Sequence, residues 1–184
     1  MGKRATAIKI AQALNCDGNN KPCGSCIPCE RIERGIHPDV QIIAPEKDEE
    51  TGIQHIVVNI KQVREMEHSA YLAPYEGKYR VFIIDSVNSI AEQAANALLK
   101  TLEEPPSSVV FLLLATNEAT ILPTIVSRYQ KLEVKALSEE NMLELLTKSH
   151  GLEADDATLL AKVSNGRFGW ALEAAKNPAI LGDR

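Results

Sequence analysis

Residues 79–85 read Tyr-Arg-Val-Phe-Ile-Ile-Asp, a largely apolar run that ends in a carboxylate. Its β-branched and aromatic side chains predict a strand over 79–84. Similar apolar runs at 40–44 and 109–115 predict two more strands, and helical patterns separate them along the chain. Strands that are apolar throughout are typical of a parallel sheet that is buried on both faces. The sequence therefore predicts an α/β fold, a parallel sheet with helices on both faces.

Apolar residues at helical spacing predict the remaining elements of this fold. Helices are expected over 4–14, 30–34, from 60 onward, 88–102 and 120–126. Asn59 and Asn88 are expected to cap two of these helices, and Pro105 with Pro106 should end the second. A last strand is expected at 132–134. The composition changes after Leu137, and three further helical segments predict a second, all-helical unit.

Composition and charge exclude some classes of function. The chain has 184 residues, a hydrophobic content of 45% and a net charge of -5, so it lacks a surface-wide basic footprint for nucleic acid. Its apolar runs are too short to span a bilayer, and no signal peptide opens the sequence. We therefore expect a cytoplasmic protein that does not contact membranes.

The four cysteines, Cys16, Cys23, Cys26 and Cys29, form one short cluster. Four thiolates at this spacing can close a tetrahedral shell around Zn²⁺, which predicts a structural zinc site with no open position for substrate. A disulfide pair and buried small side chains are weaker alternatives, because the loop is polar and no secretion signal is present. An iron–sulfur run would place its fourth cysteine downstream, whereas Cys16 lies upstream.

Two short patterns match parts of a nucleotide site. A phosphate loop ends in Gly-Lys followed by Ser or Thr, whose hydroxyl ligates Mg²⁺, but Gly2-Lys3 is followed by Arg4. Asp85 stands where a Walker B carboxylate would bind Mg²⁺, but Ser86 replaces the Glu that activates water. On the residues alone, a chance Gly-Lys pair and an Asp that caps a turn are the simpler interpretations.

Two polar residues follow later elements of the sheet domain. Asn117 ends the strand after the Asp85 strand, and the sequence predicts that its side chain lies beside that carboxylate. Arg128 follows a short helix, where it is either a plain surface cation or an arginine finger for a neighbouring subunit.

Taken together, these motifs resemble the clamp-loader subunits of bacterial DNA polymerase III, which are AAA+ proteins. The resemblance covers nearly the whole chain and rests on the four-cysteine run, His37-Pro38-Asp39, the Asp85 strand, Leu98–Pro106, Ala115–Asn117 and Ser127-Arg128. It implies an AAA+ P-loop-type α/β domain over 1–137 with an inserted zinc module at 16–29, and a small helical lid over 138–184. It also implies that the family's N-terminal strand is missing here and that its C-terminal collar domain is absent.

Among these subunits the chain looks most like delta-prime. Arg4 and Ser86 replace catalytic residues of the gamma/tau motor, and Gly169 stands at the sensor-2 Arg position, with Arg167 out of register. Arg128 is kept. The resemblance implies a stator-like subunit without ATPase or polymerase activity of its own, which supplies Arg128 as an arginine finger in trans. Its nucleotide site would be degenerate, with ATP binding weak or absent.

The implied role is loading the sliding clamp onto primed DNA during replication, as part of the DNA polymerase III holoenzyme, a nucleotidyltransferase. The implied partners are the gamma/tau motor subunits, the delta subunit, the sliding clamp and primed DNA through the assembly. Two other hypotheses remain. The chain could be a competent gamma/tau-type ATPase with an incomplete phosphate loop, using Lys3 and Asp85, or an isolated zinc-dependent protein-interaction module.

Overall fold

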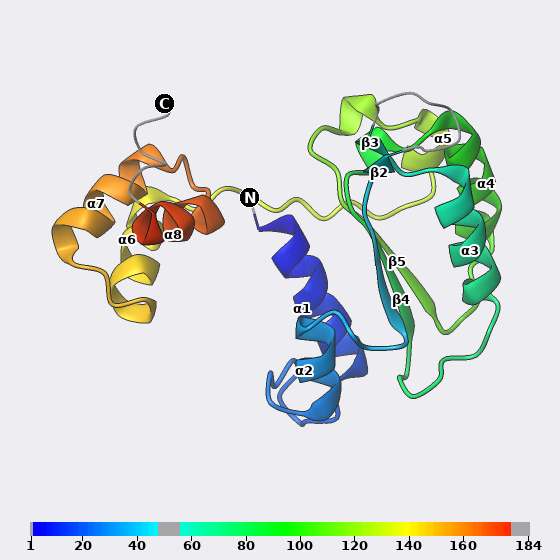
Figure 1. The fold of residues 1–184 in the computed structure, drawn as a ribbon, viewed down its shortest axis with the longest axis horizontal. Coiled ribbons are helices and arrows are strands. Elements are labelled where there is room, and N and C mark those ends of the chain that lie inside the picture. The colour runs from blue at the N-terminus through cyan, green and yellow to red at the C-terminus, as the bar shows by residue number, and fades with distance from the viewer. Residues whose placement is uncertain (1, 48–55, 178–184) are drawn as a thin grey trace. The chain divides into compact units, whose positions relative to one another are not determined.

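The computed structural model describes residues 2–47 and 56–177 (Figure 1). Contacts divide the chain into two compact units: residues 4–130 form the first, and residues 131–177 together with residues 2 and 3 belong to the second. Residues 178–184 of the expected lid lie outside the described part.

The first unit carries the sheet. Its helices are α1 (Lys3–Asn15), α2 (Ile27–Glu33), α3 (Ile60–Ala70), α4 (Glu92–Glu103) and α5 (Pro123–Val126), with 3-10 turns η1 (Val87–Ser89) and η2 (Glu118–Thr120). Its strands are β1 (Val40–Ile43), β4 (Arg80–Ile84) and β5 (Val109–Leu113), with a separate antiparallel pair β2 (Glu46–Lys47) and β3 (Ile56–Val57).

The three long strands are parallel, as the apolar runs predicted, and they lie in the order β1-β4-β5. β4 is central, with Val81 opposite Val40 and Phe82 opposite Phe111. The two phenylalanine rings stack with centroids 5.4 Å apart.

Side chains of β4 alternate between two cores, one on each face of the sheet. Phe82 and Ile84 belong to a cluster with buried residues of α3 and α4. Val81 and Ile83 belong to a second cluster with buried residues of α1 and α2. Figure 1 shows the two helix pairs on opposite sides of the strands. Burying one such side chain contributes about 1.5–3 kcal/mol, and β4 contributes to the cores on both faces of the sheet.

One expected helix starts later than predicted. α4 begins at Glu92, because the turn η1 occupies the segment around Asn88 and Ala91 is the N-cap. The Asn88 side chain serves another purpose, since its Oδ1 accepts a hydrogen bond from the Thr116 amide at 2.8 Å. It thereby ties together the loops that follow β4 and β5.

The prediction of a strand at 132–134 is wrong. The segment is extended without strand pairing, and Leu132 is 70% exposed. The segment pairs with none of the described strands, and β5, at the edge of the sheet, pairs only with β4. An apolar segment becomes a strand only where a neighbour supplies backbone partners.

The second unit is helical, with α6 (Glu139–Glu144), the π-helical turn η3 (Leu145–Ser149), α7 (Ala154–Val163) and α8 (Phe168–Lys176). Ser138 caps α6, accepting a hydrogen bond from the Asn141 amide at 3.3 Å. The core of this helical unit is a small cluster around the fully buried Met142 and Leu146. Gly166, with φ of 71°, lies so close to residue 137 that an added Cβ would sit 2.6 Å from the Leu137 carbonyl oxygen. None of the described helices is both long and apolar enough to cross a membrane.

The capping box at the start of α3 gives a test of the fold. The Asn59 side chain accepts from the Gln62 amide at 3.0 Å, and the Gln62 side chain accepts from the Asn59 amide at 3.0 Å. We expect Asn59→Ala to lower the free energy of unfolding by about 1 kcal/mol, because one amide at the helix end loses its acceptor. Chemical denaturation followed by circular dichroism measures this.

Asn96→Ala is the matched control, since Asn96 is exposed within α4. Removing its side chain should change stability by less than about 0.5 kcal/mol. Equal losses in the two variants would contradict the contribution of the cap.

Candidate functional site

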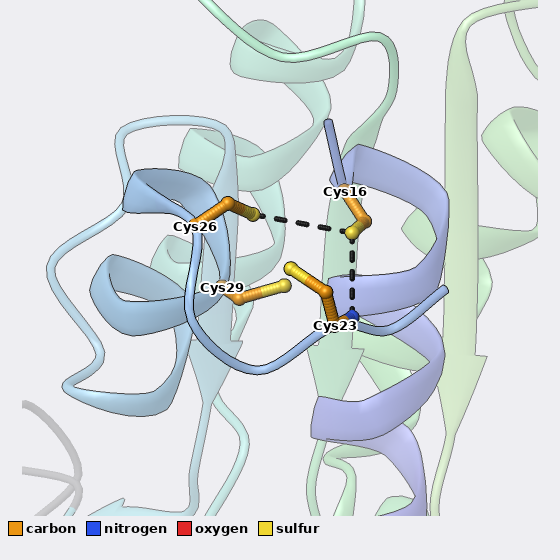
Figure 2. Close-up of side chains that lie close together, drawn as sticks. All are labelled: Cys16, Cys23, Cys26 and Cys29. Carbon is orange, nitrogen blue, oxygen red and sulfur yellow. Dashed lines mark hydrogen bonds between the residues drawn. The ribbon is translucent and has the colours of Figure 1, made fainter. Parts of the chain in front are cut away.

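The four cysteines converge on one point between α1 and α2 (Figure 2). Cys16 directly follows α1, Cys26 is the N-cap of α2 and Cys29 lies inside α2. The four sulfur atoms lie within 4.8 Å of one another, and none is in a disulfide. Cys16 and Cys29 are buried, whereas Cys23 and Cys26 are partly exposed.

This geometry fits a metal ion bound by four thiolates. In a tetrahedral zinc site with Zn–S bonds of about 2.3 Å, neighbouring sulfurs lie about 3.8 Å apart. The Sγ atoms of Cys16 and Cys26 are 3.9 Å apart. The Cys16 sulfur also accepts hydrogen bonds from the amides of Gly18 at 3.3 Å and Cys23 at 3.4 Å, which stabilise negative charge on sulfur. These four residues could therefore hold a metal ion in a closed shell.

The cysteines differ in acidity. Hydrogen bonds from the amides of Ser25 and Cys26 lower the pKa of Cys23 to about 6. Amides of Asp17 and Cys29 lower the pKa of Cys26, whereas burial raises the pKa of Cys29 to about 12. A bound cation would hold all four as thiolates, so binding would release protons, most of all from Cys29.

Glycines make the close approach of the cysteines possible. A Cβ on Gly18 would lie 3.0 Å from the Cys23 Cβ and 3.1 Å from its sulfur. Gly24 has a φ of 75°, which a side chain would disfavour. Spacing alone pointed to the cysteines, but the need for Gly18 appears only in three dimensions.

Polar side chains from α1 fasten the cysteine cluster to the rest of the unit. The buried Gln12 donates from Nε2 to the Cys29 carbonyl at 2.7 Å. Asn15 pairs with both backbone groups of Tyr79, donating to its carbonyl at 3.0 Å and accepting from its amide at 2.9 Å. The residues beside the cluster are thereby held to the chain just before β4.

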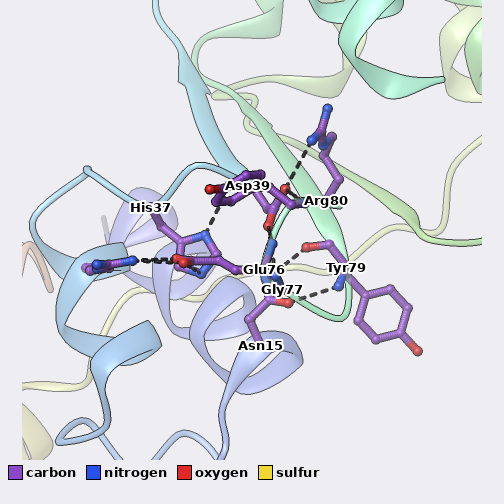
Figure 3. Close-up of polar contacts among 9 residues, drawn as sticks. Asn15, His37, Asp39, Glu76, Gly77, Tyr79 and Arg80 are labelled. Atoms are coloured by element: carbon purple, nitrogen blue, oxygen red, sulfur yellow. Dashed lines mark hydrogen bonds and ion pairs between the residues drawn. The ribbon is translucent and has the colours of Figure 1, made fainter. Parts of the chain in front are cut away.

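A buried carboxylate, Asp39, organises the same region (Figure 3). It accepts hydrogen bonds from the amides of Tyr75 at 2.7 Å, Glu76 at 2.8 Å and Gly77 at 2.8 Å, and from the Arg80 guanidinium at 3.1 Å. Burial alone would raise the pKa of Asp39, but the three amides and the guanidinium outweigh it and lower the pKa.

The neighbouring His37 lies between Asp39 and Glu76, and Glu76 in turn contacts α2. Its Nδ1 accepts from the Asp39 amide at 3.1 Å, and its Nε2 lies 3.6 Å from the Glu76 carboxylate. Arg31 of α2 donates to both oxygens of Glu76, at 2.8 and 2.9 Å. The sequence singled out His37-Pro38-Asp39 as a motif but did not assign it this role. The signal available in the sequence was Asp39, a charged residue directly before an apolar run that predicts a buried strand.

At the carboxyl end of β4, Arg4 and Asp85 come together. The Arg4 Nη1 lies 3.6 Å from the Asp85 carboxylate, with side chains 58% and 27% exposed. Ser86 follows in the left-handed region, with φ of 58°. Of the expected phosphate-loop residues, Lys3 begins α1 and Gly2 precedes it with φ of 54°.

The side chain of Asn117 hydrogen-bonds within its own loop and does not contribute to a site with Asp85 among the described residues. Its Oδ1 accepts from the Ala119 amide at 3.0 Å and caps η2. Within the described residues it makes no hydrogen bond to Asp85. Asn88, which the sequence did not single out for this site, links the loops instead, donating to the Asn117 carbonyl at 2.6 Å.

Arg128, the expected arginine finger, and Arg167, which lies near the sensor-2 position, both donate hydrogen bonds to nearby acceptors. Arg128 lies just after α5 and binds the Glu103 carboxylate, with Nε to Oε1 at 3.0 Å. Arg167 donates from Nε to the Ser164 carbonyl at 3.2 Å. No heavy atom lies within 4 Å of the position that a Cβ on Gly169 would occupy.

Two solved structures have a fold similar to that of this chain. A solved structure of a DNA polymerase III gamma subunit-related protein from Thermotoga maritima matches with a TM-score of 0.59 and 23% identity, over 96% of this chain and 58% of that one. A RuvB variant from the same organism matches with a TM-score of 0.53 and 16% identity, over 95% of this chain and 59% of that one.

The sequence comparisons are more specific. A family model described as "DNA polymerase III, delta subunit" matches residues 1–138. The chain belongs to this family, which confirms its resemblance to AAA+ clamp-loader subunits.

Curated relatives carry the names of other subunits. DNA polymerase III subunit gamma of Buchnera aphidicola is 32% identical over 100% of this chain and 50% of its own length. Subunit tau of Escherichia coli is 33% identical over 100% of this chain and 28% of its own length. The chain thus spans half or less of these two relatives.

The hydrogen bonds that Asp39 accepts from three amides and Arg80 predict a large loss of stability when Asp39 is replaced by the nearly isosteric Asn. Asp39→Asn should lower the free energy of unfolding by about 3 kcal/mol, because the amide group cannot accept from all these donors and Arg80 loses its counter-charge. Urea denaturation at pH 7 measures the loss. Glu65→Gln, exposed on α3, is the control and should be near neutral.

The same hydrogen bonds predict a pH dependence. Because the folded-state pKa of Asp39 is lowered, its contribution is complete above the unfolded pKa of about 3.9 and is lost as the pH falls through the folded value. The stability difference between wild type and Asp39→Asn should therefore narrow below about pH 4. A difference that stays constant down to pH 2 would contradict this.

Proposed function

We propose that this chain is a non-hydrolysing, delta-prime-like subunit of the DNA polymerase III clamp loader, which supports its neighbour's ATPase by supplying Arg128. The observation that carries the proposal is the pairing of Arg4 with Asp85 at 3.6 Å. In a working site the position of Arg4 would hold the Ser or Thr hydroxyl that ligates Mg²⁺. Here the positively charged guanidinium of Arg4 lies near the carboxylate that the metal would need.

Charge explains why this arrangement disfavours hydrolysis in cis. A Mg²⁺ ion at Asp85 would have to displace or lie beside the Arg4 guanidinium, and like charges repel. Ser86 offers no carboxylate to activate water. Both observations support a subunit whose own nucleotide site, comprising Gly2, Lys3, Asp85 and Asn117, is degenerate.

Arg128 is placed to act outside its own subunit. It follows the short helix α5, and its side chain is 30% exposed. An arginine inserted into a neighbouring site stabilises the charge that develops on the transferred phosphoryl group. In this proposal the partners are the gamma/tau motor subunits, the delta subunit and the sliding clamp, with primed DNA bound by the assembly.

A second candidate function is that of the motor itself. The curated relatives are gamma and tau subunits at 32–33% identity, which favours an ATP-hydrolysing chain with Lys3 and Asp85 as its ligands. ATP binding and turnover measured on the purified protein separate the two candidates. Micromolar binding with turnover would favour the motor.

We further propose that the cysteine cluster binds one zinc ion in a structural role. Four thiolates leave no position for water or substrate, so the ion would stabilise the module between α1 and α2. The close-lying sulfurs, the amides directed at Cys16 and the glycines that permit this packing support the assignment.

The arginine finger is tested by Arg128→Ala in a loader reconstituted with the motor and delta subunits. Losing the guanidinium should lower DNA-stimulated ATP hydrolysis by about tenfold or more at the site that receives it, while the chain stays folded. Arg64→Ala, an exposed arginine on α3, is the matched control. An ATPase rate equal to that of wild type would refute the assignment.

Zinc is tested by metal analysis of the purified protein. We expect one zinc per chain, and loss of that zinc in Cys29→Ser because a hydroxyl is a poor replacement for a buried thiolate. Ser25→Ala, in the same loop, should keep its metal. A metal-free wild-type protein, or zinc retained in full by Cys29→Ser, would argue against a four-cysteine site.

A further inference from the structure

The guanidinium of Arg128 is almost fully engaged within its own subunit. Glu103 Oε1 accepts from Nε at 3.0 Å and also from Nη2. On the other side, Nη1 donates to the Thr124 carbonyl at 2.6 Å and to the Ser127 hydroxyl at 3.1 Å. A guanidinium has five N–H donors, so these contacts leave one of them, on Nη2, without a partner among the described residues.

This arrangement conflicts with the geometry that an arginine finger needs. Arginine recognises phosphoryl oxygens best through two parallel N–H donors on one edge. The edge formed by Nε and Nη2 is the one that Glu103 holds. Arg128 can therefore present that edge to a phosphate only after its hydrogen bonds to Glu103 are broken.

Glu103 is itself in an electrostatically unfavourable place. It is the last residue of α4, and the carbonyl groups at the end of a helix repel a carboxylate. Pro105 and Pro106 prevent the helix from continuing, so Glu103 stays in its last turn. A cation beside Glu103 relieves this repulsion, and Arg128 supplies it from the residues that follow α5, a helix that packs against α4.

We propose that Glu103 is a positioning residue that acts as a latch, holding Arg128 against its own subunit until a phosphoryl group of a neighbour competes for it. The inference rests on the proposed finger role of Arg128. It gives the Leu-Glu-Glu-Pro-Pro segment a specific task, since Glu103 of this segment accepts hydrogen bonds from Arg128.

The strength of the pair suits an exchangeable contact. The side chains of Arg128 and Glu103 are 30% and 49% exposed, so water and salt screen their attraction. An ion pair of this kind changes an equilibrium by about two- to fivefold. A phosphoryl group with greater negative charge can displace such a carboxylate, whereas a deeply buried pair would resist exchange.

The test is Glu103→Gln in the reconstituted loader, with ATPase measured with and without primed DNA and clamp. Opening the latch should raise the DNA-free rate by about two- to fivefold. The DNA-stimulated rate should change by less than about twofold, because Arg128 is then already released. A fall in both rates, or no change in either, would overturn the latch.

Three further variants locate the effect. Glu104→Gln, the exposed neighbour on the chain, is the matched control and should resemble wild type. Glu103→Asp should restore part of the low DNA-free rate, because it keeps the charge. In the Glu103→Gln/Arg128→Ala double variant the gain should disappear, and a gain that persists there would overturn the proposal.

The outcome separates this inference from the function on which it rests. If Arg128→Ala leaves ATPase unchanged, the finger fails and the latch with it. If Arg128→Ala lowers ATPase but Glu103→Gln leaves the DNA-free rate unchanged, only the latch fails.

A measurement on the chain alone tests the contact without ATPase. Exchange of the Arg128 Nε–H proton with water, followed by ¹⁵N NMR, should be about two- to fivefold faster in Glu103→Gln than in wild type or Glu104→Gln. Equal exchange in all three proteins would show that the carboxylate does not hold the guanidinium.

Discussion

The Asp39 carboxylate is the interaction on which the arrangement of the first unit depends. A buried charge is costly unless it is fully hydrogen-bonded, and three consecutive amides together with Arg80 satisfy this one. These contacts fix the chain between α3 and β4 against the start of β1. The two adjacent strands therefore begin at the same level, which sets the register of the parallel sheet and, with it, the place where β4 ends at Asp85.

The cysteine cluster is connected to the same point. Asn15 binds the backbone of Tyr79, and Arg31 binds Glu76, whose amide donates to Asp39. An ion bound by the four thiolates would thus stabilise a module that is already fastened at two places to the segment leading into β4. This explains how a closed metal site with no chemistry of its own could still affect the sheet domain.

Two arginines, each paired with a carboxylate, underlie the proposed division of roles between this chain and its neighbour. Arg4 lies beside Asp85, where it replaces an expected metal ligand and adds positive charge. Arg128 lies at the end of α5 and is held by Glu103. In the proposed function, the first arginine would weaken a nucleotide site within the chain, and the second would act on another subunit once its carboxylate partner is displaced.

The sequence by itself determined the parallel strands, the helix cap at Asn59 and the grouping of the cysteines, because apolar periodicity, capping and ligand spacing are local properties. Only the tertiary structure decided which polar groups meet. It rejected a strand at 132–134, which has no neighbour to pair with, and it brought Glu103 to Arg128 from distant segments. Such contacts depend on how helices pack on the sheet, and a linear pattern does not encode those distances.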